Sequence, residues 1–289
     1  MEIPPAPYLP TSDPEVVEST PLSQSGWYED GQHGGLVAGL LARAVAAVPT
    51  LTPMEIARLT VDIVRVVPTV PLRVTTSVLR EGKRIQLVRA YLSAGDTQVA
   101  QATAMRLRIT DRPPPEAALP DPALLPLPVA EASPVDMERV GVGVGGRVYF
   151  HRHGVEMRQA EGEFDQPGPG AVWMRILTPL VAGEELTPLL RAVISADHGN
   201  GISKVLPTSW VFMNADLNVH LLRMPDGEWV GLRSVSWFAD LGRGVAHSQL
   251  FDAAGAIGRS VQTLFADYRA SLPGTMAPPG FSQTQDRRR

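Results

Sequence analysis

An aspartate and a histidine, Asp197 and His198, stand side by side in the stretch ISADHGNGIS, residues 194–203. Asp197 continues an apolar helix face formed by Leu189, Leu190, Val193 and Ile194. A carboxylate on the core side of a helix must find hydrogen-bond donors, because an unpaired buried charge is costly. Desolvation raises the pKa of such a carboxyl towards the range of a general base, so Asp197 is the first candidate for a catalytic residue. The alternative is an ordinary helix end whose carboxylate meets a backbone donor or water.

The helix that must position Asp197 has clear sequence boundaries. Thr187 is suited to cap it, Pro188 suits its first position, and Gly199 or Gly201 can adopt a left-handed stop. A second helix is predicted for the run GGLVAGLLARAVAAV, residues 34–48.

Alternating, strand-like segments follow the first predicted helix, among them LRVTTSVL, RIQLVRAYL and QVAQATAMRLR. Short turns separate them, so the sheet is expected to be mostly antiparallel. A helix with an antiparallel sheet, present twice, predicts an α+β fold in which the two sheets pair edge to edge or face to face.

A proline-rich stretch divides the chain almost in half. Residues 112–134 contain eight prolines, too many for a helix or a central strand. We therefore expect an N-terminal unit over residues 1–111, a stiff linker over 112–134 and a C-terminal unit over 135–270. The polar end, residues 271–289, is expected to be disordered.

The two units carry a sequence repeat. LTVDIVR at residues 59–65 matches LNVHLLR at residues 217–223, at a separation of 158 residues. A proline follows each copy, Pro68 and Pro225. This repeat predicts two related units in one chain.

These motifs, in this order, resemble the double-hotdog acyl-CoA thioesterases, and more closely the actinobacterial proteins related to type II acyl-CoA thioesterase. The resemblance rests on HGG at residues 33–35, LTVDIVRVVP, ISADHGNGIS, LNVHLLR, EWVGLRSVS and GRSVQTLF. It implies a tandem hotdog fold, with two antiparallel sheets that each wrap around a central helix.

The resemblance also implies a reaction: hydrolysis of an acyl-CoA thioester by a water molecule, without a metal. The family's Asp and Gln fall on Asp197 and Gln262, which are thus implied to hold and activate that water. The family's Thr or Ser falls on Asn214, so an amide replaces a hydroxyl. Coenzyme A is then part of the substrate, and no cofactor is expected.

The first unit supplies an internal control for these three positions. Subtracting 155 from 197 gives Ala42, and subtracting 158 from 214 and 262 gives Ile56 and Ala104. All three counterparts are apolar, so the chemistry is expected once per chain, in the C-terminal unit.

The small residues of the first helix suggest a substrate contact. Gly34 and Gly35 begin a face with almost no side chains, and free amides at this helix start are suited to bind the oxyanion of the reaction. Tight helix-on-sheet packing explains the glycines equally well.

Neither of two other histidine arrangements predicts a metal site. His33 and His198 each precede a glycine near a helix end, without a His-x-x-x-His spacing, and His198 is expected on the surface. His151 and His153 would share one face if their segment is a strand, which could hold a metal, but such a pair is more often a polar surface feature.

The amino-acid composition argues against several classes of protein. The chain has 289 residues, no cysteine and a formal net charge of −4, so thiolate chemistry is excluded and a nucleic-acid surface is not indicated. A signal peptide and a membrane-spanning run are both absent from the sequence, which predicts a cytoplasmic protein without membrane insertion. Pairing of an exposed hotdog edge or face predicts a homo-oligomer.

Two other functions stay open from the sequence. A binding protein could hold an acyl or acyl-CoA ligand without hydrolysis, which the Asn214 substitution favours. An enoyl-CoA hydratase is suggested by Asp216 and His220, but the expected Asp-x-Asn-Pro-x-His spacing is missing. The Arg287–Arg289 tail is a weaker candidate for a contact to coenzyme A phosphate.

Overall fold

A computed structural model describes residues 2–26, 28, 30–118, 126–136, 147–164, 166–207, 209–268 and 271. Its helices are α1 (Gly34–Ala47), α2 (Phe150–His153), α3 (Pro188–Ala196) and α4 (Gly199–Ile202). The first-half strands are β1 (Tyr8–Pro10), β2 (Val16–Ser19), β3 (Met54–Ile63), β4 (Leu72–Arg80), β5 (Ile85–Ala94) and β6 (Thr97–Arg108). The later strands are β7 (Ser133–Pro134), β8 (Val155–Glu161), β9 (Gly170–Ile176), β10 (Trp210–Asn214), β11 (Asp216–Leu221), β12 (Trp229–Phe238), β13 (Arg243–Asp252) and β14 (Gly255–Tyr268).

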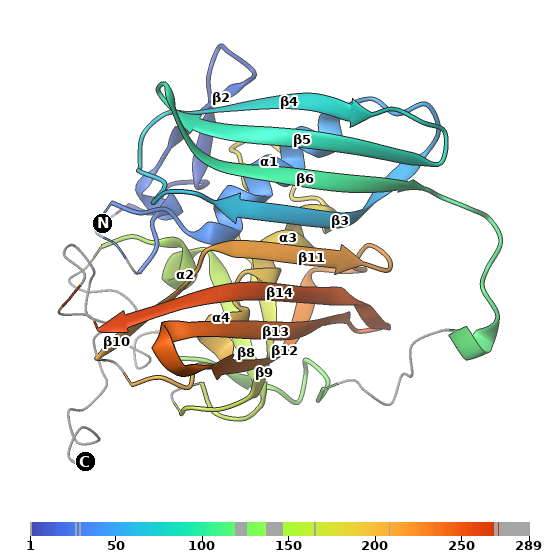
Figure 1. Cartoon of the computed structure of the whole chain (residues 1–289). Coiled ribbons are helices and arrows are strands. Elements are labelled where there is room, and N and C mark those ends of the chain that lie inside the picture. The colour runs from blue at the N-terminus through green and yellow to red at the C-terminus, as the bar shows by residue number, and fades with distance from the viewer. Residues whose placement is uncertain are drawn as a thin grey trace.

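The strands of the described residues form one sheet, in the order β1-β2-β4-β5-β6-β3-β11-β14-β13-β12-β9-β8-β7, with β10 paired to β14. Neighbouring strands run antiparallel, as predicted. Of the two arrangements expected for the sheets, edge to edge and face to face, the structure has the first, because β3 and β11 pair and make one continuous sheet (Figure 1). Each of these strands would otherwise leave an open edge of unpaired backbone groups.

The junction between β3 and β11 agrees with the sequence repeat. Thr60 pairs with Asn218, which lies 158 residues later and is therefore its own repeat counterpart. Leu59 pairs with Val219, and Val61 pairs with Leu217, so the pairing is symmetric about that point. A local two-fold axis thus passes between the two halves at this position.

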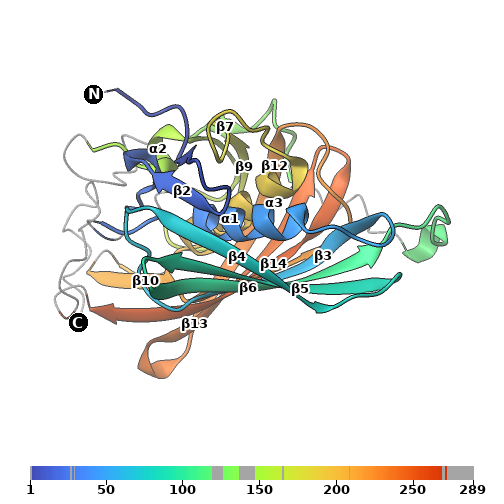
Figure 2. The same cartoon turned by 90° about the horizontal axis from the view of Figure 1, so that it is seen from above.

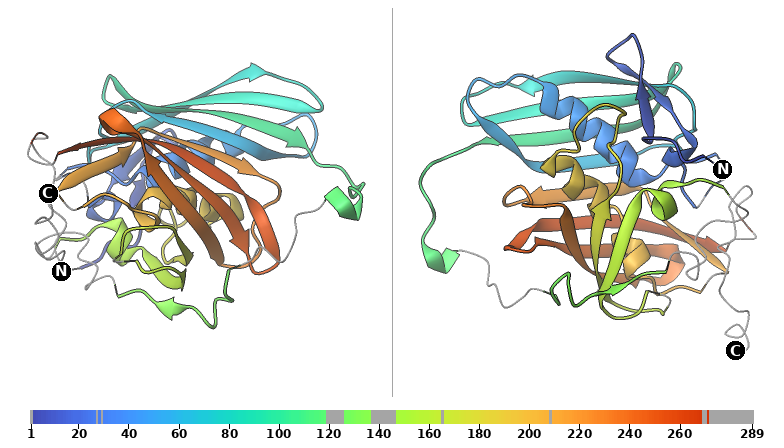
Figure 3. Two further views of the ribbon diagram at one scale, coloured as in Figure 1. Left: turned by 60° about the horizontal axis from the view of Figure 1, so that its bottom comes forward. Right: turned by 180° about the vertical axis from the view of Figure 1, so that it is seen from behind.

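Helices α1 and α3 lie side by side on the same side of the sheet, which curves around them (Figures 2 and 3). They approach closely because α1 presents glycine to α3. A Cβ built on Gly39 would lie 3.2 Å from Cγ1 of Ile194, and one on Gly35 would lie 2.7 Å from the Ile194 carbonyl oxygen. The face with few side chains therefore packs mainly helix on helix, which differs from the helix-on-sheet packing considered from the sequence.

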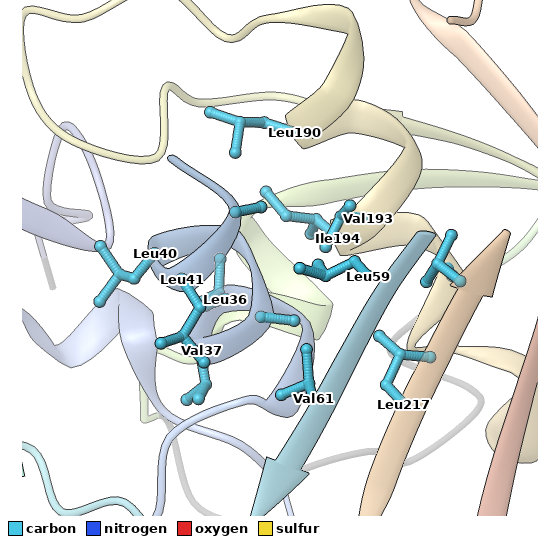
Figure 4. Close-up of a cluster of buried hydrophobic side chains, with 14 of the residues drawn as sticks. Leu36, Val37, Leu40, Leu41, Leu59, Val61, Leu190, Val193, Ile194 and Leu217 are labelled. Carbon is cyan, nitrogen blue, oxygen red and sulfur yellow. The ribbon is translucent and has the colours of Figure 1, made fainter. Parts of the chain in front are cut away.

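The core lies between these helices and the sheet. Figure 4 shows Leu59 and Val61 of β3 and Leu217 of β11 near side chains of α1 and α3. The apolar face of α3 that precedes Asp197 is buried as predicted, with Leu189, Leu190, Val193 and Ile194 at most 9% exposed. Burial of each such side chain contributes about 1.5–3 kcal/mol, so the end of α3 is fixed by the core.

The predicted start of α3 is confirmed, and its predicted stop is wrong. Thr187 Oγ1 accepts a hydrogen bond from the Leu190 N–H at 3.4 Å. Gly199 and Gly201 do not adopt positive φ, and the chain instead continues into α4. Gly199 is needed for close packing, because a Cβ there would lie 2.5 Å from Ser248 Oγ and 2.9 Å from Gln262 Oε1.

The described part of the proline-rich stretch leaves β6 and runs outside the sheet (Figure 1). It includes a single 3-10 turn, Glu116–Ala118, and its last two residues, Ser133–Pro134, pair with β8 at the sheet edge. The predicted tail lies outside the described residues except for Ser271. Within the described chain, no helix is long and apolar enough to span a membrane.

Candidate active site

The three residues singled out in the C-terminal half meet at one carboxylate. Asp197 Oδ1 accepts a hydrogen bond from Asn214 Nδ2 at 2.7 Å and a longer one from Gln262 Nε2 at 3.4 Å. Asp197 is at the end of α3, Asn214 ends β10, and Gln262 lies within β14. Asn214 is 17 residues and Gln262 is 65 residues beyond Asp197 in the sequence, and the packing of α3 on the sheet brings the three together.

Asp197 is only 6% exposed, and its carboxyl has the character of a poised base. Burial raises its pKa to about 7, while hydrogen bonds from Asn214, from the Gly35 N–H and from Gln262 oppose that rise. A carboxylate of this kind accepts a proton near neutral pH more readily than an exposed aspartate does.

Gln262 lies on the buried side of the Asp197 carboxylate. Its Nε2 donates to the Asp197 backbone oxygen at 2.9 Å, and its Oε1 accepts from the Asn200 N–H at 3.1 Å. Since both ends of its amide are engaged and the residue is 1% exposed, Gln262 fixes the end of α3 and the start of α4 against β14.

The first turn of α1 lies against the same carboxylate. A Cβ built on Gly34 would be 2.9 Å from Asp197 Oδ2, so only glycine allows this approach. The Gly35 N–H lies 3.1 Å from His33 Nδ1, the side chain that caps α1. His33 Nδ1 is in turn 3.4 Å from Asp197 Oδ2.

A cavity of about 470 Å³ opens onto this group. Gly34, Asp197 and Asn214 lie on its wall, whereas Gln262 does not. Most of the remaining wall is apolar, and its apolar members include Val37, Ile63, Val67, Phe164, Leu206, Trp210, Phe212, Met213 and Phe265. Two cationic side chains, Arg65 and Lys204, also line it. The cavity therefore offers an apolar volume, positive charge and a poised carboxylate.

Three histidines gather on the same wall. One ring nitrogen from each of His33, His151 and His198 lies within 4.8 Å of the others. Burial lowers the pKa of His151 to about 3 and that of His198 to about 4, and it lowers the pKa of His33 well below its ordinary value. All three rings are accordingly neutral near pH 7.

Sequence models of two protein domains match this chain. The model of the acyl-CoA thioesterase C-terminal domain matches residues 115–266, and the model of the N-terminal domain matches residues 23–107. The chain belongs to the acyl-CoA thioesterase family. No curated protein matches it.

Several solved structures share the fold of this chain. A candidate thioesterase II from Thermobifida fusca YX has a TM-score of 0.68 at 16% identity, covering 91% of this chain and 96% of its own. The acyl-CoA thioesterase II TesB2 from Mycobacterium marinum has a TM-score of 0.63 at 15% identity, covering 91% and 97%. A protein with a hot dog fold from Alicyclobacillus acidocaldarius has a TM-score of 0.64 at 15% identity, covering 89% and 95%. At these identities the likeness shows the fold.

In this acyl-CoA thioesterase family member, the surface positions predicted for His198 and His151 are wrong. His198 is 4% exposed, because the chain turns from α3 directly into α4 and keeps the ring inside. The FHRHG segment forms the short helix α2, where residues two apart point in different directions. His151 therefore joins the cluster, and His153 instead approaches the Tyr149 backbone oxygen at 3.1 Å.

The first-half counterparts of the three site residues are buried among apolar side chains. Ala42 and Ala104 are 0% exposed and Ile56 is 4% exposed, so none offers a polar group to a cavity. Sequence reasoning missed the histidine cluster, since its members are 118 and 47 residues apart and share no motif. Only the packing of α1, α2 and α3 brings them together.

Proposed function

We propose that this acyl-CoA thioesterase family member hydrolyses acyl-CoA to a free acid and coenzyme A, with a water molecule held at Asp197. The observation that carries the proposal is the buried Asp197 carboxylate, which Asn214 and Gln262 hold on the wall of a largely apolar cavity. We further propose that each half is one hotdog unit, so the chain is a tandem of two.

Asn214 and Gln262 have different roles in this mechanism. Asn214 Nδ2 donates to Asp197 and also to the Asp216 backbone oxygen at 3.2 Å, so Asn214 Oδ1 is the atom left to accept from a water. Gln262 is a positioning residue, because it lies behind Asp197 and outside the cavity wall.

The reaction proceeds by proton transfer through Asp197. The water oxygen attacks the thioester carbonyl carbon as the carboxylate removes a proton from the water. The carbon–sulfur bond then breaks, and the proton passes from Asp197 to the leaving sulfur. No metal takes part in this scheme. Because Gly34 lines the cavity while the Gly35 N–H faces His33, the Gly34 N–H is assigned to the developing oxyanion.

Substrate binding follows from the cavity wall. The apolar side chains suit an acyl chain, and the cationic Arg65 and Lys204 suit the phosphates of coenzyme A.

Release of the coenzyme A thiol tests this function. Purified protein is offered saturated acyl-CoAs of short, medium and long chain, and free thiol is followed with a thiol-reactive dye. Steady release of thiol, with the matching free acid found by mass spectrometry, is expected for at least one chain length. Absence of thiol release from every substrate would contradict the proposal.

The binding-only alternative predicts tight acyl-CoA binding without thiol release, and the same assay combined with calorimetry separates the two. For the hydratase alternative, neither Asp216 nor His220 lines the cavity, and His220 is exposed. Asp216 instead accepts hydrogen bonds from the Thr263 N–H and from Asn218. These contacts favour a structural role for Asp216.

A further inference from the structure

We propose that His33, His151 and His198 form a binding site for one divalent transition-metal ion of the zinc class. The three side chains come from separate segments: the cap of α1, the short helix α2 and the junction between α3 and α4. One ring nitrogen from each lies within 4.8 Å of the others, and all three residues line the cavity. The proposed hydrolysis uses no metal, so this inference goes beyond that function and does not rest on it.

The orientation of His198 is that of a metal ligand. Its Nδ1 faces the carbonyl oxygens of Ile194 and Ser195 at 3.2 and 3.3 Å, so Nδ1 carries the proton and Nε2 keeps a lone pair. Metal-binding histidines commonly donate their second ring nitrogen to a backbone carbonyl in this way. Nε2 is buried and has no hydrogen-bond partner among the described residues. An unpartnered buried acceptor is costly, and a bound cation removes that cost.

His33 has the second arrangement that is common at metal sites, a carboxylate next to the ring. Its Nδ1 lies 3.4 Å from Asp197 Oδ2. In the tautomer with a proton on Nδ1, this nitrogen donates to Asp197, and Nε2 is left for an ion. The Gly35 N–H, which lies 3.1 Å from the same Nδ1, then keeps its hydrogen bond to the Asp197 carboxylate.

The spacing of the rings allows an ion after a modest closure. Zinc–imidazole bonds of about 2.0–2.1 Å place tetrahedral ligand nitrogens roughly 3.4 Å apart, so the rings must close by about 1.4 Å at most. The ring centroid of His198 lies 4.7 Å from that of His33 and 5.2 Å from that of His151, and the centroids of His33 and His151 lie 6.3 Å apart. Neutral imidazoles without a thiolate favour zinc, nickel or copper over magnesium or calcium. The Asp197 carboxylate lies 3.4 Å from His33 Nδ1, and the positive charge of Lys204 acts on His151.

Direct metal binding tests the site on the full-length chain without a polyhistidine tag. After treatment with a chelator, the protein is titrated with zinc chloride by calorimetry and with cobalt chloride by visible absorption. Binding of one ion per chain is expected, with cobalt bands of the intensity typical of low-coordinate nitrogen sites. His151→Phe preserves the ring packing and removes the ligand, so zinc affinity should fall at least about 10-fold.

The matched control is His220→Phe, the same substitution at an exposed histidine of β11. Its zinc affinity should equal that of the unmodified protein. The proposal is overturned if the unmodified chain binds no zinc, an outcome that does not depend on how any variant folds. It is equally overturned if His151→Phe and His220→Phe bind zinc as tightly as each other.

Discussion

At the scale of single residues, the proposed hydrolysis depends on how Asn214 holds Asp197. Its amide donates at 2.7 Å to a carboxylate that is otherwise held by a longer contact from Gln262. A hydrogen bond to a charged group contributes about 1.5–3 kcal/mol, so its loss changes rates by about 10-fold to 100-fold.

The variants Asn214→Ala and Asn214→Thr show whether position 214 needs only a hydrogen-bond donor or needs an amide. Asn214→Ala should lower kcat by about 10-fold to 100-fold, because Asp197 loses its shortest side-chain donor. Asn214→Thr, which keeps a donor, should retain more activity than the alanine variant. Thiol release under saturating substrate measures both, and equal rates for the two variants would show that the donor is unimportant.

The sequence predicted these site residues because the resemblance fixed each position along the chain. It did not predict that Gln262 lies behind the carboxylate, since depth depends on how α4 packs on β14. It also placed His198 on the surface, because a sequence pattern for a helix end does not say where the chain turns next. The histidine cluster is a product of tertiary packing alone.

At the scale of elements, the close approach of α1 to Asp197 requires glycine at position 34. Gly34→Ala should lower kcat about 10-fold or more, because its methyl group would displace the carboxylate oxygens, which lie 2.9 and 3.0 Å from the added Cβ. Gly201→Ala is the matched control, since it is also on the cavity wall and its Cβ would meet nothing within 4 Å. Equal losses in the two variants would argue against displacement of Asp197.

An ion pair between a buried carboxylate and a partly exposed arginine joins the end of β13 to the segment after β11. Asp252 is 0% exposed and binds Arg223 at 2.5 and 2.6 Å, together with the N–H groups of Asp226 and Ala254. Burial tends to raise the pKa of Asp252, but these donors outweigh it and lower the pKa below its ordinary value.

Asp252→Asn should therefore lower the free energy of unfolding by about 1–3 kcal/mol at pH 7. This range allows for solvent screening, because Arg223 is partly exposed. A lowered folded-state pKa gives stability that is present above the unfolded pKa of about 3.9 and is lost as pH falls below it. The difference between the two proteins in urea unfolding should thus shrink below about pH 4. Asp240→Asn, at an exposed position, should change stability little, and a difference for Asp252→Asn that is constant with pH would contradict this account.

Periodicity in the sequence predicted the long helix α1 and the strands β4 to β6 well, because local patterns determine them. The sequence left open whether the two sheets pair edge to edge or face to face, because the pairing of β3 with β11 joins residues about 158 positions apart. Alternating apolar residues show that a strand has a buried face, but they do not show which strand lies beside it.

At the scale of the whole molecule, the two halves are held together by more than the chain that connects them. Residues 58–62 of β3 pair with residues 216–220 of β11, and α1 packs against α3. The site itself needs both halves, since Gly34 comes from the first and Asp197 from the second. The homo-oligomer expected from the sequence stays a prediction.

Cleavage of the connecting segment should consequently leave an intact molecule. With a protease site inserted between Pro114 and Pro115, outside the sheet, the two fragments should elute together in size-exclusion chromatography and keep thiol release. Separation of the fragments under native conditions would contradict the role given to the β3–β11 junction. The uncut insertion protein is the control.

Asp197 is proposed to activate the attacking water, and the turnover of Asp197→Asn tests this role most directly. Asparagine has nearly the same shape but cannot take a proton, so kcat for thiol release should fall by about 10²-fold to 10⁴-fold. Asp216→Asn, a nearby carboxylate that is not on the cavity wall, should leave kcat within about two-fold. Unchanged turnover by a folded Asp197→Asn protein would contradict the account.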